Sequence, residues 1–156
     1  MKGRTLADQI EDYIKWLLDV SAGMVEVQRQ ELAERFTCVP SQVTYVLSTR
    51  FTIERGYLVE SRRGGGGYVR IVRLPLDSKE RLREWLHRAV GDGLSPSSSM
   101  DLLEKLREEG FLTPREKLFL EAVLSQTFSL DQTTGDRLRA AMLKAVVLSL
   151  LRSDLS

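Results

Sequence analysis

Residues 57–74 read YLVESRRGGGGYVRIVRL, in which β-branched and aromatic runs flank two arginines and four consecutive glycines. Runs of this kind are typical of strands, so we expect strands over residues 57–61 and 68–74 joined by the arginine–glycine loop. Each glycine costs roughly 0.5–1 kcal/mol relative to alanine when its backbone becomes ordered. Four in succession therefore indicate a loop that needs a bare, mobile backbone.

The segment in front of this hairpin has the periodicity of short helices. Thr5 and Asp8 have the spacing of a capping box, and the apolar residues behind them predict a first helix that ends near residues 21–23. The next expected elements are a strand over residues 24–27, a helix over about 28–36 and a helix over about 40–51. The order helix, strand, helix, short turn, helix, hairpin is the pattern of a winged helix-turn-helix domain.

The last of these helices is expected to enter the major groove of DNA. Val43, Val46 and Leu47 share its apolar face, and the opposite face carries polar side chains without a carboxylate that would repel phosphate. On that face Gln42 can pair with adenine, and Thr44 can offer a hydroxyl, or a methyl group to thymine. The expected contacts from this helix are Ser41, Gln42, Thr44, Tyr45, Ser48 and Thr49, and the expected contacts with the DNA backbone are Arg29, Arg35, Thr37 and Arg50.

The arginine–glycine loop is expected to be the wing. The minor groove is only about 6 Å wide, so a bulky hairpin tip would clash with its walls. The glycines Gly64, Gly65, Gly66 and Gly67 form a tip without side chains, and Arg62 and Arg63 suit the negative potential of a narrow A·T-rich groove. The alternative is a merely floppy hairpin turn. The adjacent arginines and the preceding helices favour the wing.

Charge is concentrated around this loop. The chain has a formal net charge of +1, yet residues 50–73 contain six arginines against two glutamates. An anionic partner is therefore expected at this segment. Cys38 is the single cysteine, which excludes an internal disulfide and favours a reducing compartment. No signal-peptide core or membrane-spanning run is recognisable, so we expect a cytoplasmic protein without a membrane partner.

The fold class expected is mainly α, with an α+β N-terminal part. Residues 1–74 form the winged helix-turn-helix domain, residues 75–99 a connecting helix and linker, and residues 100–156 an all-α dimerisation domain. The connecting helix is expected over residues 79–90, and the polar stretch GDGLSPSSS at 91–99 is expected to be flexible. Three helices are expected to follow, over about residues 100–109, 113–127 and 132–152.

The last helix is apolar around nearly its whole circumference, so it must be buried on several sides. We expect two copies of the chain to bury it in an intermolecular four-helix bundle, with residues 112–124 as the second contributor. The expected dimer contacts are Leu118, Leu138, Met142, Ala145 and Leu148. The alternative is a core helix within one chain.

Enzymatic activity is not expected. The glycine run lacks the GxxxxGK[ST] signature and precedes a strand instead of a helix. His87 is the single histidine, so neither a catalytic set nor a zinc site can be assembled around it, and no cofactor is expected. The remaining alternative to a DNA-binding protein is a winged-helix adaptor that binds proteins.

Two stretches, TCVPSQVTYVLSTRFT at 37–52 and RRGGGGYVRI at 62–71, together with the long helical tail, resemble the CtsR family of bacterial class III stress-gene repressors. The resemblance covers essentially the whole chain, and the tetraglycine wing is its most diagnostic part. It implies a dimeric repressor that binds tandem heptanucleotide repeats upstream of Clp protease and chaperone genes.

The resemblance also implies how such a repressor is switched off. It would release its operator on heat stress, and the ordering entropy of the glycine wing offers a physical hypothesis for this response. It would also be phosphorylated by a protein arginine kinase and marked for degradation by a Clp chaperone-protease. Arg62 is the expected phosphorylated residue and Arg63 the second choice, because a phosphate would replace attraction to DNA with repulsion.

Overall fold

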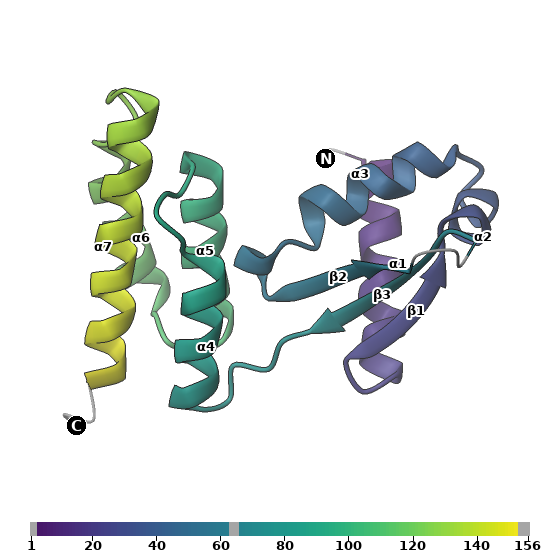
Figure 1. Cartoon of the computed structure of the whole chain (residues 1–156), viewed down its shortest axis with the longest axis horizontal. Coiled ribbons are helices and arrows are strands. Elements are labelled where there is room, and N and C mark those ends of the chain that lie inside the picture. The colour runs from purple at the N-terminus through teal and green to yellow at the C-terminus, as the bar shows by residue number, and fades with distance from the viewer. Residues whose placement is uncertain (1–2, 63–65, 153–156) are drawn as a thin grey trace. The chain divides into compact units, whose positions relative to one another are not determined.

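A computed structural model describes residues 3–62 and 66–152 (Figure 1). The chain forms two compact units, the first within Met1–Thr52 and Gly56–Leu74 and the second within Ile53–Arg55 and Pro75–Ser156. The three residues Ile53–Arg55 therefore belong to the second unit, although the chain returns to the first unit at Gly56 and stays there until Leu74.

The first unit combines helices with one antiparallel sheet. Its elements are α1 (Leu6–Val20), β1 (Met24–Gln28), α2 (Arg29–Arg35), α3 (Pro40–Arg50), β2 (Tyr57–Ser61) and β3 (Tyr68–Arg73). In the described part of the chain the strand order is β1-β3-β2, with both pairs antiparallel. The expected hairpin is thus present, and the short N-terminal strand adds to its free edge. This architecture confirms the winged helix-turn-helix prediction.

Both halves of the expected capping box are formed at the start of α1. The Thr5 amide donates to Asp8 Oδ2 at 3.0 Å, and the Asp8 amide donates to Thr5 Oγ1 at 3.1 Å. Behind the cap, Ile10, Ile14 and Leu18 are fully buried at helical spacing. They belong to one core with apolar residues of α2, α3 and the inner face of the sheet, so burial of this stripe holds α1 in place.

A tight turn connects α2 to α3. Thr37 adopts a positive φ of 52°, which reverses the chain direction within a few residues. Val39 is the N-cap of α3 and Pro40 occupies its first turn, as the sequence predicts. Val43 and Val46 then bury the inner face of α3, so the polar face of the helix is left toward solvent.

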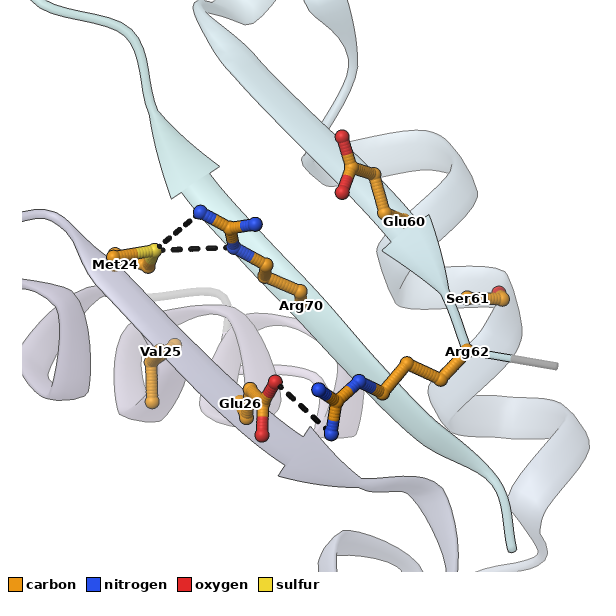
Figure 2. A pocket seen from close by; sticks show the side chains of 7 residues that line it. All are labelled: Met24, Val25, Glu26, Glu60, Ser61, Arg62 and Arg70. Carbon is orange, nitrogen blue, oxygen red and sulfur yellow. Dashed lines mark hydrogen bonds and ion pairs between the residues drawn. The ribbon is translucent and has the colours of Figure 1, made fainter. Parts of the chain in front are cut away.

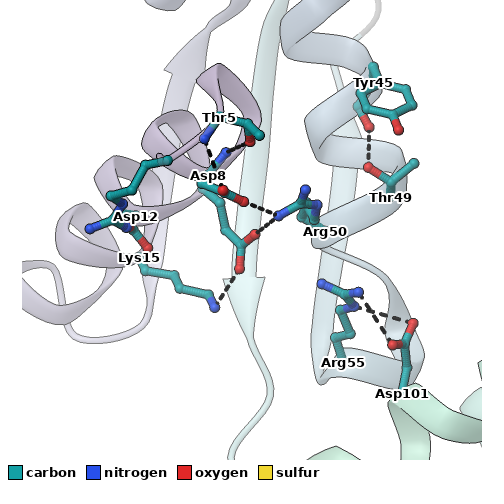
Figure 3. Close-up of polar contacts among 11 residues, drawn as sticks. Thr5, Asp8, Asp12, Lys15, Tyr45, Thr49, Arg50, Arg55 and Asp101 are labelled. Carbon is teal, nitrogen blue, oxygen red and sulfur yellow. Dashed lines mark hydrogen bonds and ion pairs between the residues drawn. The ribbon is translucent and has the colours of Figure 1, made fainter. Parts of the chain in front are cut away.

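The second unit is helical. It contains the 3₁₀ turn η1 (Ile53–Arg55) and the helices α4 (Lys79–Ala89), α5 (Pro96–Glu108), α6 (Pro114–Ser125) and α7 (Gln132–Arg152). The Trp85 indole is buried and donates to the Ile53 carbonyl at 2.7 Å, while Arg55 pairs with Asp101 at 3.2 Å (Figure 3). These contacts hold η1 on the second unit. None of the helices in the described part of the chain is long and apolar enough to cross a membrane.

The prediction of a flexible linker over residues 91–99 is wrong for residues 96–99, which belong to a helix. Helix α5 begins at Pro96, because the Ser95 side chain accepts from the Ser98 amide and proline suits the first helical position. Leu94 is buried, and its amide donates to the Asp136 carbonyl at 2.9 Å. The Ser-Pro pair is a helix start signal that the polar composition of the stretch conceals.

A buried arginine ties three segments of the second unit together. The guanidinium of Arg139 donates to the Leu94 carbonyl at 2.8 Å and to Thr127 Oγ1 at 3.0 Å, and it pairs with Asp136. A buried charge requires such partners. Gly135, one turn earlier in α7, leaves the space: a Cβ there would lie 2.9 Å from Arg139 Nη1 and 3.2 Å from the Thr127 carbonyl oxygen.

Gly135→Ala is therefore expected to destabilise the protein, although alanine ordinarily favours a helix over glycine. The new methyl group has to displace a backbone carbonyl or the buried guanidinium, an overpacking that costs roughly 1–3 kcal/mol. Urea unfolding at one fixed protein concentration measures the change, with Gly91→Ala as the control because nothing lies within 4 Å of a Cβ there. An equal or higher stability of the Gly135 variant would contradict the role given to Arg139.

Candidate nucleic-acid interface

The outer face of α3 presents the polar side chains that the sequence singled out. Ser41, Thr44, Tyr45 and Ser48 are exposed, and Gln42 and Thr49 are half-buried. Tyr45 is 55% exposed. The side chain of Gln42 makes no hydrogen bond within the described residues, so its amide is available to a ligand. The structure thus brings the six expected α3 contacts onto one accessible face.

Three hydroxyl groups on this face are already engaged with the helix backbone. Thr49 Oγ1 donates to the Tyr45 carbonyl at 2.7 Å (Figure 3), and Ser48 Oγ donates to the same carbonyl at 3.0 Å. Thr44 Oγ1 donates to the Pro40 carbonyl at 3.3 Å. While these bonds hold, the hydroxyls can only accept. They suit a donor on a base edge, and a bond to a phosphate requires the hydroxyl to rotate.

Arg50 at the end of α3 is paired with carboxylates of α1. Its Nη1 lies 2.9 Å from Asp8 Oδ1 and 2.6 Å from Glu11 Oε1 (Figure 3). The hydrogen bond from Arg50, followed by the one from the Thr5 amide, lowers the pKa of Asp8 from 3.8 to about 2. The hydrogen bonds of Arg50 with Asp8 and Glu11 raise the pKa of its guanidinium. Its expected contact with the DNA backbone stays a prediction, and two carboxylates compete for it.

Acid should weaken this link between α1 and α3. Because the pKa of Asp8 is lower in the folded protein, its stabilising effect is complete above pH 3.8 and is lost as the pH falls toward about 2. Asp8→Asn should therefore lower stability at neutral pH and flatten the loss of stability across that acidic window. Urea unfolding at several pH values measures this, with Asp92→Asn, an exposed aspartate of the second unit, as the control. Parallel acid profiles for wild type and Asp8→Asn would contradict it.

Hydrogen bonds from the β1–α2 junction hold the wing at Gly66, Gly67 and Ser61. The Gln28 side chain donates to the Gly66 carbonyl at 3.0 Å, and the Arg29 amide donates to the Gly67 carbonyl at 3.1 Å. The Arg29 guanidinium donates to Ser61 Oγ at 2.9 Å on the opposite strand. Gly66 and Gly67 have φ values of 62° and 85°, a region that favours glycine. Arg29 therefore anchors the wing, and its contact with the DNA backbone stays a prediction.

The outer face of the sheet carries charges of both signs. Glu26 lies opposite Arg70 across one strand pair, and Glu60 lies opposite Arg70 across the other. Arg62 Nη1 lies 3.5 Å from Glu26 Oε1, whereas Arg70 directs its guanidinium to the Met24 sulfur (Figure 2). These residues line an open pocket of about 490 Å³. The remaining wing residues of the expected interface, Arg63, Gly64 and Gly65, lie outside the described residues.

Sequence reasoning did not single out Gln28, Glu26 or Val39. Gln28 and Glu26 act on wing residues more than thirty positions away, so no local pattern could reveal them. Val39 is an apolar N-cap that is 62% exposed beside the polar face of α3, where it can contact a thymine methyl group. Its exposure is visible only in the structure. Among residues 3–62 and 66–152, no three His, Cys, Asp or Glu side chains could together hold a metal ion.

Both α6 and α7 carry exposed apolar side chains. Among the described residues of α6, Leu124 alone is buried, while Leu118 is 61% exposed. Of the other expected dimer contacts, Leu138, Ala145 and Leu148 are exposed and Met142 is half-buried. The inner side of α7 is buried within its own unit through residues such as Leu143 and Val147. The chain thus buries one side of α7 and leaves apolar residues of the other side exposed, as is typical of a surface that binds another protein.

Comparisons with known proteins cover nearly the whole chain. The family model of the CtsR N-terminal HTH domain matches residues 5–75, and that of the CtsR C-terminal dimerization domain matches residues 78–148. The transcriptional regulator CtsR of Geobacillus stearothermophilus is 44% identical over 147 residues, 93% of this chain and 96% of the relative. Its namesake from Bacillus subtilis (strain 168) is 39% identical over 150 residues, 95% of this chain and 97% of the relative.

A solved structure agrees with these matches. It is a crystal structure of CtsR in complex with a 26bp DNA duplex, and it is 42% identical in sequence. The match covers 94% of this chain and 99% of the other, with a TM-score of 0.83. The similarity therefore extends through both compact units.

Proposed function

Because this chain belongs to the CtsR family of transcriptional regulators, we propose that it is a homodimeric repressor that binds double-stranded operator DNA in a sequence-specific manner. Helix α3 lies in the major groove and the arginine–glycine wing in the minor groove. The observation that carries this proposal is the outer face of α3, which exposes Ser41, Thr44, Tyr45 and Ser48 and has no carboxylate. A family of transcriptional regulators is not a class of enzymes.

The two parts of the interface have different tasks. Gln42 reads a base pair through its unengaged amide, and bidentate pairing with adenine is the geometry that suits it. Arg62 supplies charge to the minor groove, where its contribution depends little on sequence. Gln28 and Arg29 hold the wing at Gly66 and Ser61 through hydrogen bonds. These parts of the wing are therefore already in place when it meets the duplex.

Dimerisation follows from the exposed apolar side chains of α6 and α7. Leu118, Leu138 and Leu148 are exposed, and burying them against a second copy removes apolar surface from water. Met142 and Ala145 complete the interface, and the arrangement is an intermolecular four-helix bundle. A dimer presents two copies of α3 and of the wing, one copy for each of two heptanucleotide repeats.

The family supplies the remaining parts of the proposal. The target genes encode Clp protease and chaperones, the repressor leaves its operator on heat stress, and it acts in the cytoplasm beside the chromosome. A protein arginine kinase phosphorylates Arg62 and thereby marks the protein for a Clp chaperone-protease. Arg62 is 65% exposed and accessible to such an enzyme, and the added phosphate reverses its charge.

Heat release through the wing depends on how much backbone is ordered by DNA. Gly66 and Gly67 are already held by Gln28 and Arg29, so these two glycines add little to the entropic cost of ordering the wing on DNA. That cost rises with temperature and weakens binding.

Salt dependence tests the electrostatic part of this function. Affinity for a duplex should fall steeply as salt rises, because bound counterions are released from the phosphates. Arg62→Gln should lower affinity and reduce the slope of log K against log salt by about 1, and Arg62→Glu should abolish binding. Arg83→Gln, on the exposed side of α4, serves as the control. A flat salt response, or no binding to any duplex, would favour a protein-binding adaptor.

Sequence readout is tested separately at Gln42. Gln42→Ala should cost about 1–3 kcal/mol in binding to the operator and relax specificity at one base pair. Footprinting on the upstream DNA identifies the operator, and titration of every single-base variant of that operator locates the affected position. Gln9→Ala on α1 is the matched control. If Gln42→Ala weakened binding equally for all sequences, α3 would not be reading that base pair.

A further inference from the structure

The arginine proposed for the minor groove is directed elsewhere in the free protein. Arg62 follows the last residue of β2, and its side chain turns back across β3 toward β1 (Figure 2). There its Nη1 lies 3.5 Å from Glu26 Oε1. A guanidinium paired with a carboxylate has part of its positive charge compensated, so it attracts a phosphate or the negative potential of a groove less strongly.

The position of the Arg70 side chain explains why Glu26 is available to Arg62. Arg70 lies directly opposite Glu26 in the strand register and would be its natural cross-strand partner. The guanidinium of Arg70 instead contacts the Met24 sulfur, at 2.8 Å from Nη2 and 3.1 Å from Nε. The carboxylate of Glu26 is thereby left to the arginine at the start of the wing.

We infer that Glu26 is an internal competitor of DNA for Arg62 and lowers the affinity of the protein for its operator. This inference rests on the proposed function. Binding breaks the Arg62–Glu26 ion pair, and the lost interaction subtracts from the gain in the groove. Glu26 never has to touch DNA, and its effect passes through the position of Arg62.

The size of the effect follows from exposure. The side chains of Arg62 and Glu26 are 65% and 44% exposed, so water and salt screen their attraction. An exposed ion pair of this kind changes an equilibrium constant by about 1.5- to 5-fold. The pair is weak enough for DNA to break and strong enough for its loss to be measured.

Glu60 provides a matched control. It is an exposed glutamate on the same outer face of the sheet, two residues before Arg62, and it lies on the other side of Arg70 from Glu26. Within the described residues it makes no ion pair. Glu60→Gln therefore removes the same charge at a similar place and reproduces any general gain from a more positive domain.

The experiment is a titration of operator duplex with wild type, Glu26→Gln and Glu60→Gln of the full chain at low and at physiological salt. Glu26→Gln should bind about 1.5- to 5-fold more tightly than wild type, with a smaller gain for Glu60→Gln and a narrower difference at the higher salt. In an Arg62→Gln background, Glu26→Gln should lose its advantage over Glu60→Gln. Thermal unfolding at matched concentration confirms that each variant is folded.

The outcomes separate this inference from the proposed function. If wild type binds duplex DNA in a salt-dependent manner and the two glutamate variants gain equally, Glu26 has no specific role and the inference is overturned. The inference is likewise overturned if the advantage of Glu26→Gln survives the loss of Arg62. Absence of duplex binding by folded wild type would instead reject the proposed function, and with it the premise of the inference.

Discussion

The alternation of side chains along β3 is the constraint on which the first unit depends. Val69 and Ile71 are fully buried and join the sheet to the helices, while Arg70 between them faces outward. Since β3 pairs with both β1 and β2, shifting it by one residue would bury Arg70 and expose both apolar side chains. The same register places the wing beside the junction of β1 and α2, where Gln28 and Arg29 can hold it.

Local sequence overstates the positive field around the wing. Six arginines between residues 50 and 73 suggest a strongly basic segment, but the fold brings distant carboxylates to several of them. Arg50 meets two acidic residues of α1, Arg73 lies 2.7 Å from Asp19, and Arg62 lies within reach of Glu26. The free protein is therefore closer to neutral at this surface than its sequence indicates. A ligand that competes for these arginines has to offer a higher charge density than single carboxylates do.

Features encoded by neighbours in the chain could be predicted from the sequence, and features that depend on distant contacts could not. The capping box of α1, the proline start of α3, the hairpin and the bounds of α7 all follow from local patterns. The polar face of α3 follows from helical periodicity in the same way. The start of α5 at Pro96 differs from the prediction, and the polar composition of the stretch also hides the burial of Leu94, which depends on a distant helix. The anchoring of the wing by Gln28 likewise joins residues far apart in sequence.

The detour of the chain through η1 has a consequence for dividing this protein. Ile53–Arg55 lies between α3 and β2 in sequence, yet its partners Trp85 and Asp101 belong to the helical unit. A fragment cut after residue 74 would keep this turn and lose the indole and the carboxylate that hold it. The turn that follows α3 would lack the same two contacts if residues 1–74 were grafted onto a foreign dimerisation domain.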